Sequence, residues 1–282
     1  MGPSGGRRSI MSGMFFEKDG EGCPHRPVQV GPVTFGGDQI VIIAGPCTVE
    51  SREQLMEIAW AVKEAGGAVL RGGAFKPRTS PASFQGMKEE GLSLLAEARA
   101  ATGLPVVTEV LDTSQLDDVA AVADMIQIGS RNMCNSVLLR RAGASGKPVF
   151  LKRGMGATVQ EFLYAAEYVL REGCSDLVLC ERGIRTFEDS TRFTLDLNAV
   201  PVIKQRSWLP VLVDPSHGTG VASLVAPMAR AAIACGADGI MVEIHPHPEA
   251  ALCDGNQCET PEHFFELVRS LRAVAESVGR TL

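Results

Sequence analysis

The chain has 282 residues and a net charge of −6; 45% of its residues are hydrophobic and 21% are charged. This composition excludes collagen-like, low-complexity and wholly disordered chains, and eight cysteines without C-x-x-C spacing favour a reducing, cytoplasmic location over a disulfide framework or a zinc ribbon. A nucleic-acid partner is disfavoured because duplex binders carry a basic excess, and a membrane span is disfavoured because no stretch approaches 18 apolar residues.

Three regions follow one another along the chain. Residues 1–25 show no apolar periodicity and are predicted to be a flexible leader. Residues 26–40 contain a strand-like stretch interrupted by Gly36-Gly37, which predicts a small β-hairpin. Residues 41–282 alternate short apolar runs with stretches of helical spacing, and we expect them to form the catalytic unit.

The apolar runs in this third region are rich in Val, Ile and Leu and do not alternate with polar residues. Such runs are typical of parallel strands buried on both faces. The predicted strands are residues 41–44, 68–71, 106–109, 125–128, 149–152, 177–180, 211–213 and 239–243. Eight strand–helix units predict a single (β/α)₈ TIM barrel. An open doubly wound sheet is the alternative, but the chain lacks a glycine-rich dinucleotide-binding turn.

Helical stripes separate the predicted strands. One begins after Ser51, a predicted N-cap, and another after Thr158, which has Glu161 at the capping-box position. A further stripe includes Leu224 and Met228 as predicted core residues.

Cations gather at the predicted carboxyl ends of the strands, where a barrel places its active site. They are Arg71, Lys76, Arg78, Arg131, Lys152, Arg153 and Arg182. In a net acidic chain this set predicts recognition of phosphate or carboxylate groups, although any one of these residues could instead be a solvated surface charge. Within the set, Pro77 favours extended backbone, so that Arg78 and Thr79 can bind one phosphate while Lys76 reaches a separate point. The alternative for this segment is a proline turn that opens a helix.

A second group of side chains has the chemistry of a metal site. Cys47, His217 and Glu243 come from the ends of the first, seventh and eighth predicted strands, and Asp254 comes from the loop after the eighth. These three strands are neighbours in a closed barrel. One sulfur, one nitrogen and two carboxylates suit one divalent ion such as Mn²⁺, Fe²⁺, Co²⁺ or Zn²⁺. Cys47 could instead be a buried small hydrophobic residue, and a Cys47–His217 nucleophile pair would leave the surrounding cations unexplained.

Several motifs occur in one order: Gly45-Pro46-Cys47, GAFKPRTS at 73–80, LKRG at 151–154, CERGIRTF at 180–187 and Asp214-Pro215-Ser216-His217. Over about residues 30–275 they resemble 3-deoxy-D-arabino-heptulosonate 7-phosphate (DAHP) synthase, in its short type I (β) form. The related 3-deoxy-D-manno-octulosonate 8-phosphate synthase typically has Lys-Ala-Asn-Arg-Ser at the position of residues 76–80. The resemblance therefore favours erythrose 4-phosphate over arabinose 5-phosphate as the aldose.

The resemblance implies a transferase that condenses phosphoenolpyruvate with erythrose 4-phosphate, giving DAHP and phosphate in the first step of the shikimate pathway. It implies catalytic roles for Lys76, His217 and Cys47, with Lys76 as general acid, and one divalent metal on Cys47, His217, Glu243 and Asp254. The implied substrate-binding residues are Arg71, Lys76, Pro77, Arg78, Thr79, Glu109, Arg131, Lys152 and Arg182. A homotetramer or homodimer is also implied.

This chain departs from related short forms at Ala82, where an aromatic residue is common, and at Trp208, where a histidine is common. Residues 1–37 are too few for a regulatory or chorismate mutase domain, so no built-in feedback domain is expected. Four alternatives stay open at this point: the eight-carbon sugar-acid synthase, an enzyme for an altered aldose phosphate, an inactive barrel that binds anions, and a Cys–His hydrolase.

Overall fold

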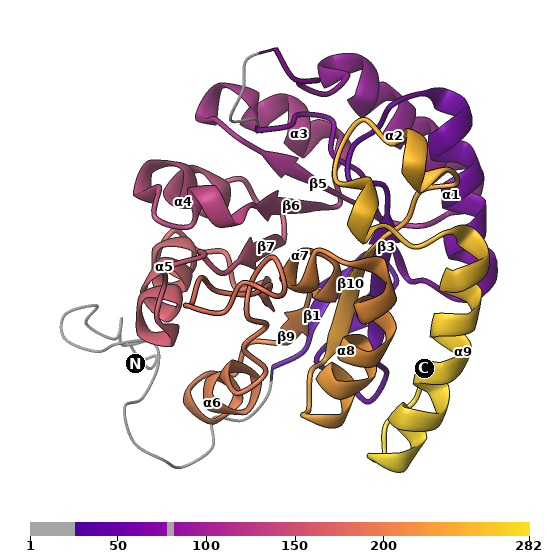
Figure 1. The fold of residues 1–282 in the computed structure, drawn as a ribbon. Helices are drawn as coiled ribbons and strands as arrows, with labels where there is room; N and C mark the ends of the chain where they lie inside the picture. The colour runs from indigo at the N-terminus through magenta and orange to yellow at the C-terminus, as the bar shows by residue number, and fades with distance from the viewer. Residues whose placement is uncertain (1–25, 78–81) are drawn as a thin grey trace, which may run out of the picture.

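The computed structural model describes residues 26–77 and 82–282, and the predicted leader lies outside them. Eight parallel strands form a closed barrel in the order β10-β3-β4-β5-β6-β7-β8-β9 (Figure 1). The strands are β3 (Val41–Gly45), β4 (Val69–Arg71), β5 (Val106–Val110), β6 (Met125–Ile128), β7 (Val149–Lys152), β8 (Leu177–Glu181), β9 (Val211–Val213) and β10 (Gly239–Glu243). The predicted TIM barrel is confirmed, and pairing of β10 with β3 excludes the open sheet.

Helices surround the barrel (Figure 1). They are α1 (Arg52–Ala65), α2 (Lys88–Thr102), α3 (Leu116–Val122), α4 (Ser136–Gly143), α5 (Val159–Arg171), α6 (Ala199–Arg206), α7 (Pro215–Thr219), α8 (Ala222–Ala234) and α9 (Pro261–Ser277). The Ser51 side chain accepts a hydrogen bond from the Gln54 amide, and Thr158 and Glu161 form a full capping box. Both predicted caps are confirmed, and each satisfies amide groups that a helix start leaves without partners.

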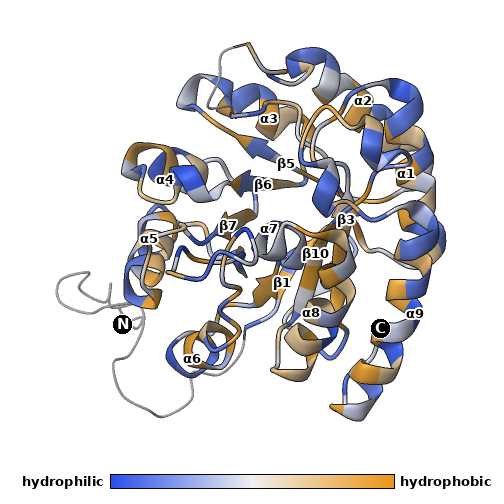
Figure 2. Ribbon diagram, in the orientation of Figure 1, coloured by the Kyte–Doolittle hydropathy of each residue, from blue (hydrophilic) through white to orange (hydrophobic). Residues whose placement is uncertain are grey.

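The core has two parts, one between the strands and the helices and one inside the barrel. Figure 2 shows the matching pattern, in which the strands are largely hydrophobic and helices such as α1 and α9 carry both hydrophobic and hydrophilic residues. Among the described residues, no helix has the length and apolar character that crossing a bilayer requires.

The predicted hairpin is present as β1 (Val28–Val30) and β2 (Val33–Phe35), paired antiparallel. Its apolar side chains, including the fully buried Phe35, pack against barrel-interior residues such as Phe150. The Arg26 amide donates to the carbonyl of Trp208, which precedes β9, so the hairpin covers the amino-terminal end of the barrel. The carboxyl-terminal end is left for the βα loops.

Four strands end in a charged residue at that second end. These residues are Arg71 on β4, Lys152 on β7, Glu181 on β8 and Glu243 on β10, and all are buried. Buried charges are costly unless they are paired or bind an ion. Their partners therefore show what this end of the barrel is built to hold.

Candidate functional site

A cavity of about 540 Å³ opens at the carboxyl-terminal end of the barrel. Of the predicted site residues, those that line it are Arg71, Lys76, Pro77, Glu109, Arg131, Lys152, Arg182, His217 and Asp254. Arg78 and Thr79, predicted to bind the aldose phosphate, lie outside the described residues. One cavity thus collects residues from seven of the eight barrel strands or the loops that follow them.

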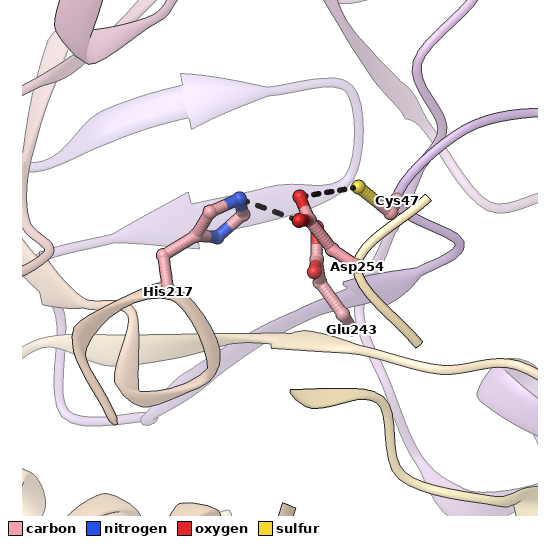
Figure 3. Close-up of side chains that lie close together, drawn as sticks. All are labelled: Cys47, His217, Glu243 and Asp254. Atoms are coloured by element: carbon pink, nitrogen blue, oxygen red, sulfur yellow. Dashed lines mark hydrogen bonds and ion pairs between the residues drawn. The ribbon is translucent and has the colours of Figure 1, made fainter. Parts of the chain in front are cut away.

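The four predicted metal ligands come together at one side of this cavity. One ligand atom from each of Cys47, His217, Glu243 and Asp254 lies within 4.8 Å of the others. Figure 3 shows the side chains pointing toward one another, with Cys47 Sγ 3.4 Å from Asp254 Oδ2 and His217 Nε2 3.4 Å from Glu243 Oε1. An ion held by such donors at about 2.0–2.3 Å keeps its ligands within about 4.6 Å of one another, so the group fits a divalent metal.

The barrel places these ligands through strand register and local loop geometry. β10 pairs with β3 so that Glu243 lies opposite Gly45, two residues before Cys47. His217 sits on the short helix α7, whose first turn is capped by the Asp214 carboxylate accepting from the His217 amide at 2.9 Å. Asp254 adopts a left-handed backbone with φ 52°, a conformation that Asp and Asn tolerate better than most residues.

His217 is held as a neutral imidazole with one nitrogen free to bind. Its Nδ1 lies 2.7 Å from Asp214 Oδ2, and the Nδ1–H group donates a hydrogen bond to this carboxylate. The Nε2 lone pair is then left facing Glu243. Burial lowers the pKa of His217 to about 4, against the opposing effect of Asp214 and Glu243. A carboxylate–histidine pair of this kind is the usual way to orient a metal-binding imidazole.

Glu243 stays ionised although it is fully buried. Burial alone would raise the pKa of its carboxyl, but His217, Arg71 and Lys76 outweigh burial and lower the pKa. Arg71 forms an ion pair with Oε1, and Gln257 Nε2 donates to Oε2 at 2.6 Å. Arg71 also donates to the Cys47 carbonyl at 3.3 Å, so this predicted substrate-binding residue both lines the cavity and supports two of the predicted metal ligands.

Cys47 is a protonated thiol in the metal-free chain. The hydrogen bond with Cys253, whose Sγ is 3.4 Å away, together with burial and Glu243 raises the pKa of Cys47 well above its ordinary value. Lys76 Nζ lies 2.8 Å from the same sulfur. Burial would lower the pKa of Lys76, but the Cys47 and Cys253 sulfurs and Glu243 outweigh it, and the amine keeps its proton.

The other side of the cavity carries Arg182, a buried cation with two unpaired donor atoms. Arg182 is buried against the Phe193 ring, 4.3 Å from its centroid, and burial lowers its pKa. Among the described residues, its Nε and Nη1 atoms have no hydrogen-bond partner. Since buried donors are normally paired, these two atoms mark a place for an anion from outside the chain.

One predicted rim cation has a different role. Arg153 is buried and does not line the cavity; its Nη1 donates to Glu181 Oε2 and to Asp196 Oδ2, both at 2.8 Å. The prediction that Arg153 faces a substrate anion in the cavity is wrong. Side chains alternate between the inner and outer surface along a strand, and Arg153 follows the inward Lys152. Arg153 instead fixes the loop after β8 to the barrel.

Glu109 lies at the cavity wall beside the cations. Gln127 Nε2 donates to its Oε2 at 3.0 Å, which sets the orientation of the carboxylate. A Cβ on Gly129 would lie 1.9 Å from Glu109 Oε1, so a larger residue at this position would require the carboxylate to move. Glu109 therefore occupies a fixed place next to the cavity.

Among the cations that line the cavity, sequence reasoning missed Arg185 and Arg192, which belong to the long loop after β8. They stand several residues beyond the strand end, where position along the chain no longer predicts position in space. The only available signal was a loop of unusual length carrying positive charge, which is typical of functional loops.

Comparison with solved structures agrees with the barrel and its loops. A crystal structure of the phospho-2-dehydro-3-deoxyheptonate aldolase (DAHP synthase) of Thermotoga maritima superimposes with a TM-score of 0.89 at 53% identity, covering 92% of this chain and 76% of that one. A truncated 3-deoxy-D-arabino-heptulosonate 7-phosphate synthase from the same organism gives 0.86 at 50% identity, covering 92% and 95%.

Sequence comparison separates two groups of relatives. The T. maritima phospho-2-dehydro-3-deoxyheptonate aldolase is 54% identical over 252 residues, which are 89% of this chain and 75% of the relative. The 2-dehydro-3-deoxyphosphooctonate aldolase of Nitrobacter winogradskyi is 33% identical over 265 residues, covering 87% and 92%. Residues 24–278 match the DAHP synthetase I family. With both the family match and the 54% identity, the chain belongs to the DAHP synthetase I family.

Proposed function

We propose that this chain is a DAHP synthase, a transferase that joins phosphoenolpyruvate to erythrose 4-phosphate and releases phosphate. The observation that carries the proposal is a cavity with a Cys–His–Glu–Asp cluster on one wall and the unpaired, buried Arg182 on the other. An anion site can hold a phosphorylated nucleophile, and a metal site opposite it can hold the aldehyde that the nucleophile attacks. The family membership and the 54% identical relative support the same activity.

Phosphoenolpyruvate is the substrate proposed for the cationic wall, the side of the cavity lined by Arg131, Lys152 and Arg182. Arg182 presents two unpaired donors, and Arg131 and Lys152 line the same cavity. Lys152 is held by its ion pair with Asp214, which also orients His217, so the anion site and the metal site share one carboxylate. Together these cations offset the charge that two phosphorylated substrates bring into a confined space.

Lys76 lies between the metal-ligand cluster and the cationic wall, where it can donate a proton. It lines the cavity, and its Nζ lies next to Cys47 Sγ and 3.3 Å from the Cys47 carbonyl. In the proposed reaction C3 of phosphoenolpyruvate attacks the aldehyde carbon, and Lys76 donates a proton to the aldehyde oxygen as it gains charge. Water then adds at C2, and phosphate leaves.

A single divalent ion, Mn²⁺, Fe²⁺, Co²⁺ or Zn²⁺, is proposed for Cys47, His217, Glu243 and Asp254. When bound, it supplies Lewis-acid polarisation of the aldehyde oxygen. The chain's own part is to keep the ligands close together, to hold His217 neutral and to keep both carboxylates ionised.

Arg78, Thr79 and Pro77 are proposed for the phosphate of the aldose, and Pro77 lines the cavity. Among the described cysteines, Cys47, Cys134, Cys174, Cys180, Cys235 and Cys258 are free thiols, which accords with a reaction in the reducing cytoplasm. The homotetramer or homodimer stays a prediction about the oligomeric state.

The aldose preference tests this proposal against the eight-carbon alternative, for which the chain has relatives at 33% identity. We expect kcat/KM for erythrose 4-phosphate to exceed that for arabinose 5-phosphate by about a hundredfold, the discrimination that a pocket of fixed length achieves against a longer homologue. Both aldose phosphates would be compared at saturating phosphoenolpyruvate by phosphate release. A preference for arabinose 5-phosphate would assign the chain to octulosonate synthesis.

A further inference from the structure

Arg192 reaches from the loop after β8 to the carboxylate side of the metal-ligand cluster. Its Nη1 donates to Gln257 Oε1 at 2.8 Å and lies 3.4 Å from Asp254 Oδ1. Gln257 in turn donates from Nε2 to Glu243 Oε2 at 2.6 Å. Because the amide oxygen of Gln257 faces Arg192, its nitrogen must face Glu243. Arg192 thus contacts one ligand carboxylate directly and a second through Gln257.

The same two contacts hold the turn on which Asp254 sits. Asp254 precedes the 3₁₀ turn η4 (Gly255–Gln257), and Gln257 ends it, so Arg192 bonds to both ends. The left-handed backbone of Asp254 costs energy and persists only where neighbouring groups hold it. Arg192 is one such group.

The backbone of Arg192 is fixed to the helix that carries His217. The Arg192 amide donates to the Thr219 carbonyl at 2.9 Å, and the next residue's amide donates to the Gly218 carbonyl at 3.1 Å. Gly220, at φ +71°, lets the Arg192 stem pass, since a Cβ there would lie 2.5 Å from Arg192 Cβ. Arg192 is therefore attached to α7 through its backbone and to the Asp254 turn through its side chain.

We propose that Arg192 is a positioning residue for the metal site, joining the segments that carry His217, Asp254 and Glu243 so that the ligands are preformed. The inference rests on the proposed metal-dependent function. Hydrogen-bond partners of metal ligands typically contribute about 10–100-fold in metal affinity. Simple electrostatics gives the opposite sign, because a cation close to a divalent ion weakens its binding.

The test is an equilibrium titration of the metal-stripped full chain with Co²⁺ in competition with a chelator. Binding is measured from the thiolate-to-cobalt absorption band. Arg192→Gln should raise the Co²⁺ dissociation constant about 10–100-fold. Arg192→Lys, which keeps the charge and one donor group, should recover part of this loss. Arg185→Gln is the matched control: it removes the same charge from the same cavity. The described contacts of Arg185 include none with the four ligands, so this variant should bind Co²⁺ as tightly as the wild type or more tightly.

Wild-type or tighter Co²⁺ binding by Arg192→Gln would overturn the proposal. If that variant does not fold, Gln257→Leu breaks the same connection from the other side, and wild-type affinity in Gln257→Leu would overturn it equally. A wild-type chain that binds no Co²⁺ would contradict the proposed metal site itself. If instead the wild type and the Arg192 variant bind Co²⁺ equally well, the metal site stands and only the role of Arg192 is contradicted.

Discussion

Replacing Cys47 with alanine should lower kcat/KM for the condensation by about a thousandfold and remove the bound metal. Lewis-acid polarisation is worth several kcal/mol in the transition state, and about 1.4 kcal/mol corresponds to a factor of ten in rate. Cys47 is the sole sulfur in the four-residue cluster, and its loss leaves three donors around the site. The measurements are steady-state kinetics with both substrates and metal content per chain.

The matched control for this prediction is Cys174→Ala, which removes another buried thiol far from the cluster. Cys174 contacts the carbonyls of Lys147 and Asp176, and Asp176 immediately precedes β8, at the amino-terminal end of the barrel. This variant should keep its metal and its turnover. Full activity and one metal per chain in Cys47→Ala would contradict the assigned role of Cys47.

Replacing Arg182 with methionine should weaken use of phosphoenolpyruvate at least about a hundredfold in kcat/KM while making the free protein more stable. Charge-assisted hydrogen bonds contribute about 1.5–3 kcal/mol each, and Arg182 has two buried donors for a ligand. In the free protein the same two donors are unsatisfied, at a cost of about 1–3 kcal/mol. Methionine removes that cost, so the free energy of unfolding should rise by a similar amount.

Arg153 provides the opposite case at the neighbouring strand end. It is as buried as Arg182, but Glu181 and Asp196 pair with it. Arg153→Met leaves these carboxylates without their cation, and the free energy of unfolding should fall by about 3–5 kcal/mol. Chemical denaturation of both variants measures the free energy of unfolding. Steady-state kinetics on the folded protein measures kcat/KM for phosphoenolpyruvate. An Arg182 variant that is destabilised as much as the Arg153 variant, with unchanged use of phosphoenolpyruvate, would show that Arg182 is structural.

The strands could be predicted to within one residue because they are buried on both faces. The run 177–180, for example, is β8 (Leu177–Glu181), and the extra residue is a buried carboxylate paired with Arg153. For this strand the apolar run ends at Cys180, whereas the barrel strand continues through Glu181. Tertiary pairing, rather than local composition, therefore sets the last residue.

Helix faces were less predictable. The stripe through Leu224 and Met228 was predicted to face the core. Ala232, on the same stripe, is buried, but Leu224 is exposed, and α8 also buries Val225, Ala229 and Ile233. This helix is apolar nearly all round, so its periodicity does not select one face. Packing against α9 and β10 decides the orientation, and that information lies far away in the chain.

The four-residue cluster could be predicted because its members stand at or beyond the ends of strands that adjoin in a closed barrel. Asp254 required one further step, since it stands beyond the strand on a left-handed turn. The role of Arg192 could not be predicted from strand ends, because its contact with Asp254 joins two loops 62 residues apart in the chain. Strand ends predict positions in a barrel, whereas the meeting of long loops depends on the complete fold.

The central claim is that the cluster and the cationic wall together condense phosphoenolpyruvate with erythrose 4-phosphate. The most direct test incubates chelator-stripped protein with both substrates, with and without added Mn²⁺, and follows the loss of enolpyruvate absorbance and the release of phosphate. We expect consumption only with metal, yielding one phosphate and one seven-carbon keto acid for each phosphoenolpyruvate. No consumption with any divalent metal, with either the four-carbon or the five-carbon aldose phosphate, would contradict the account.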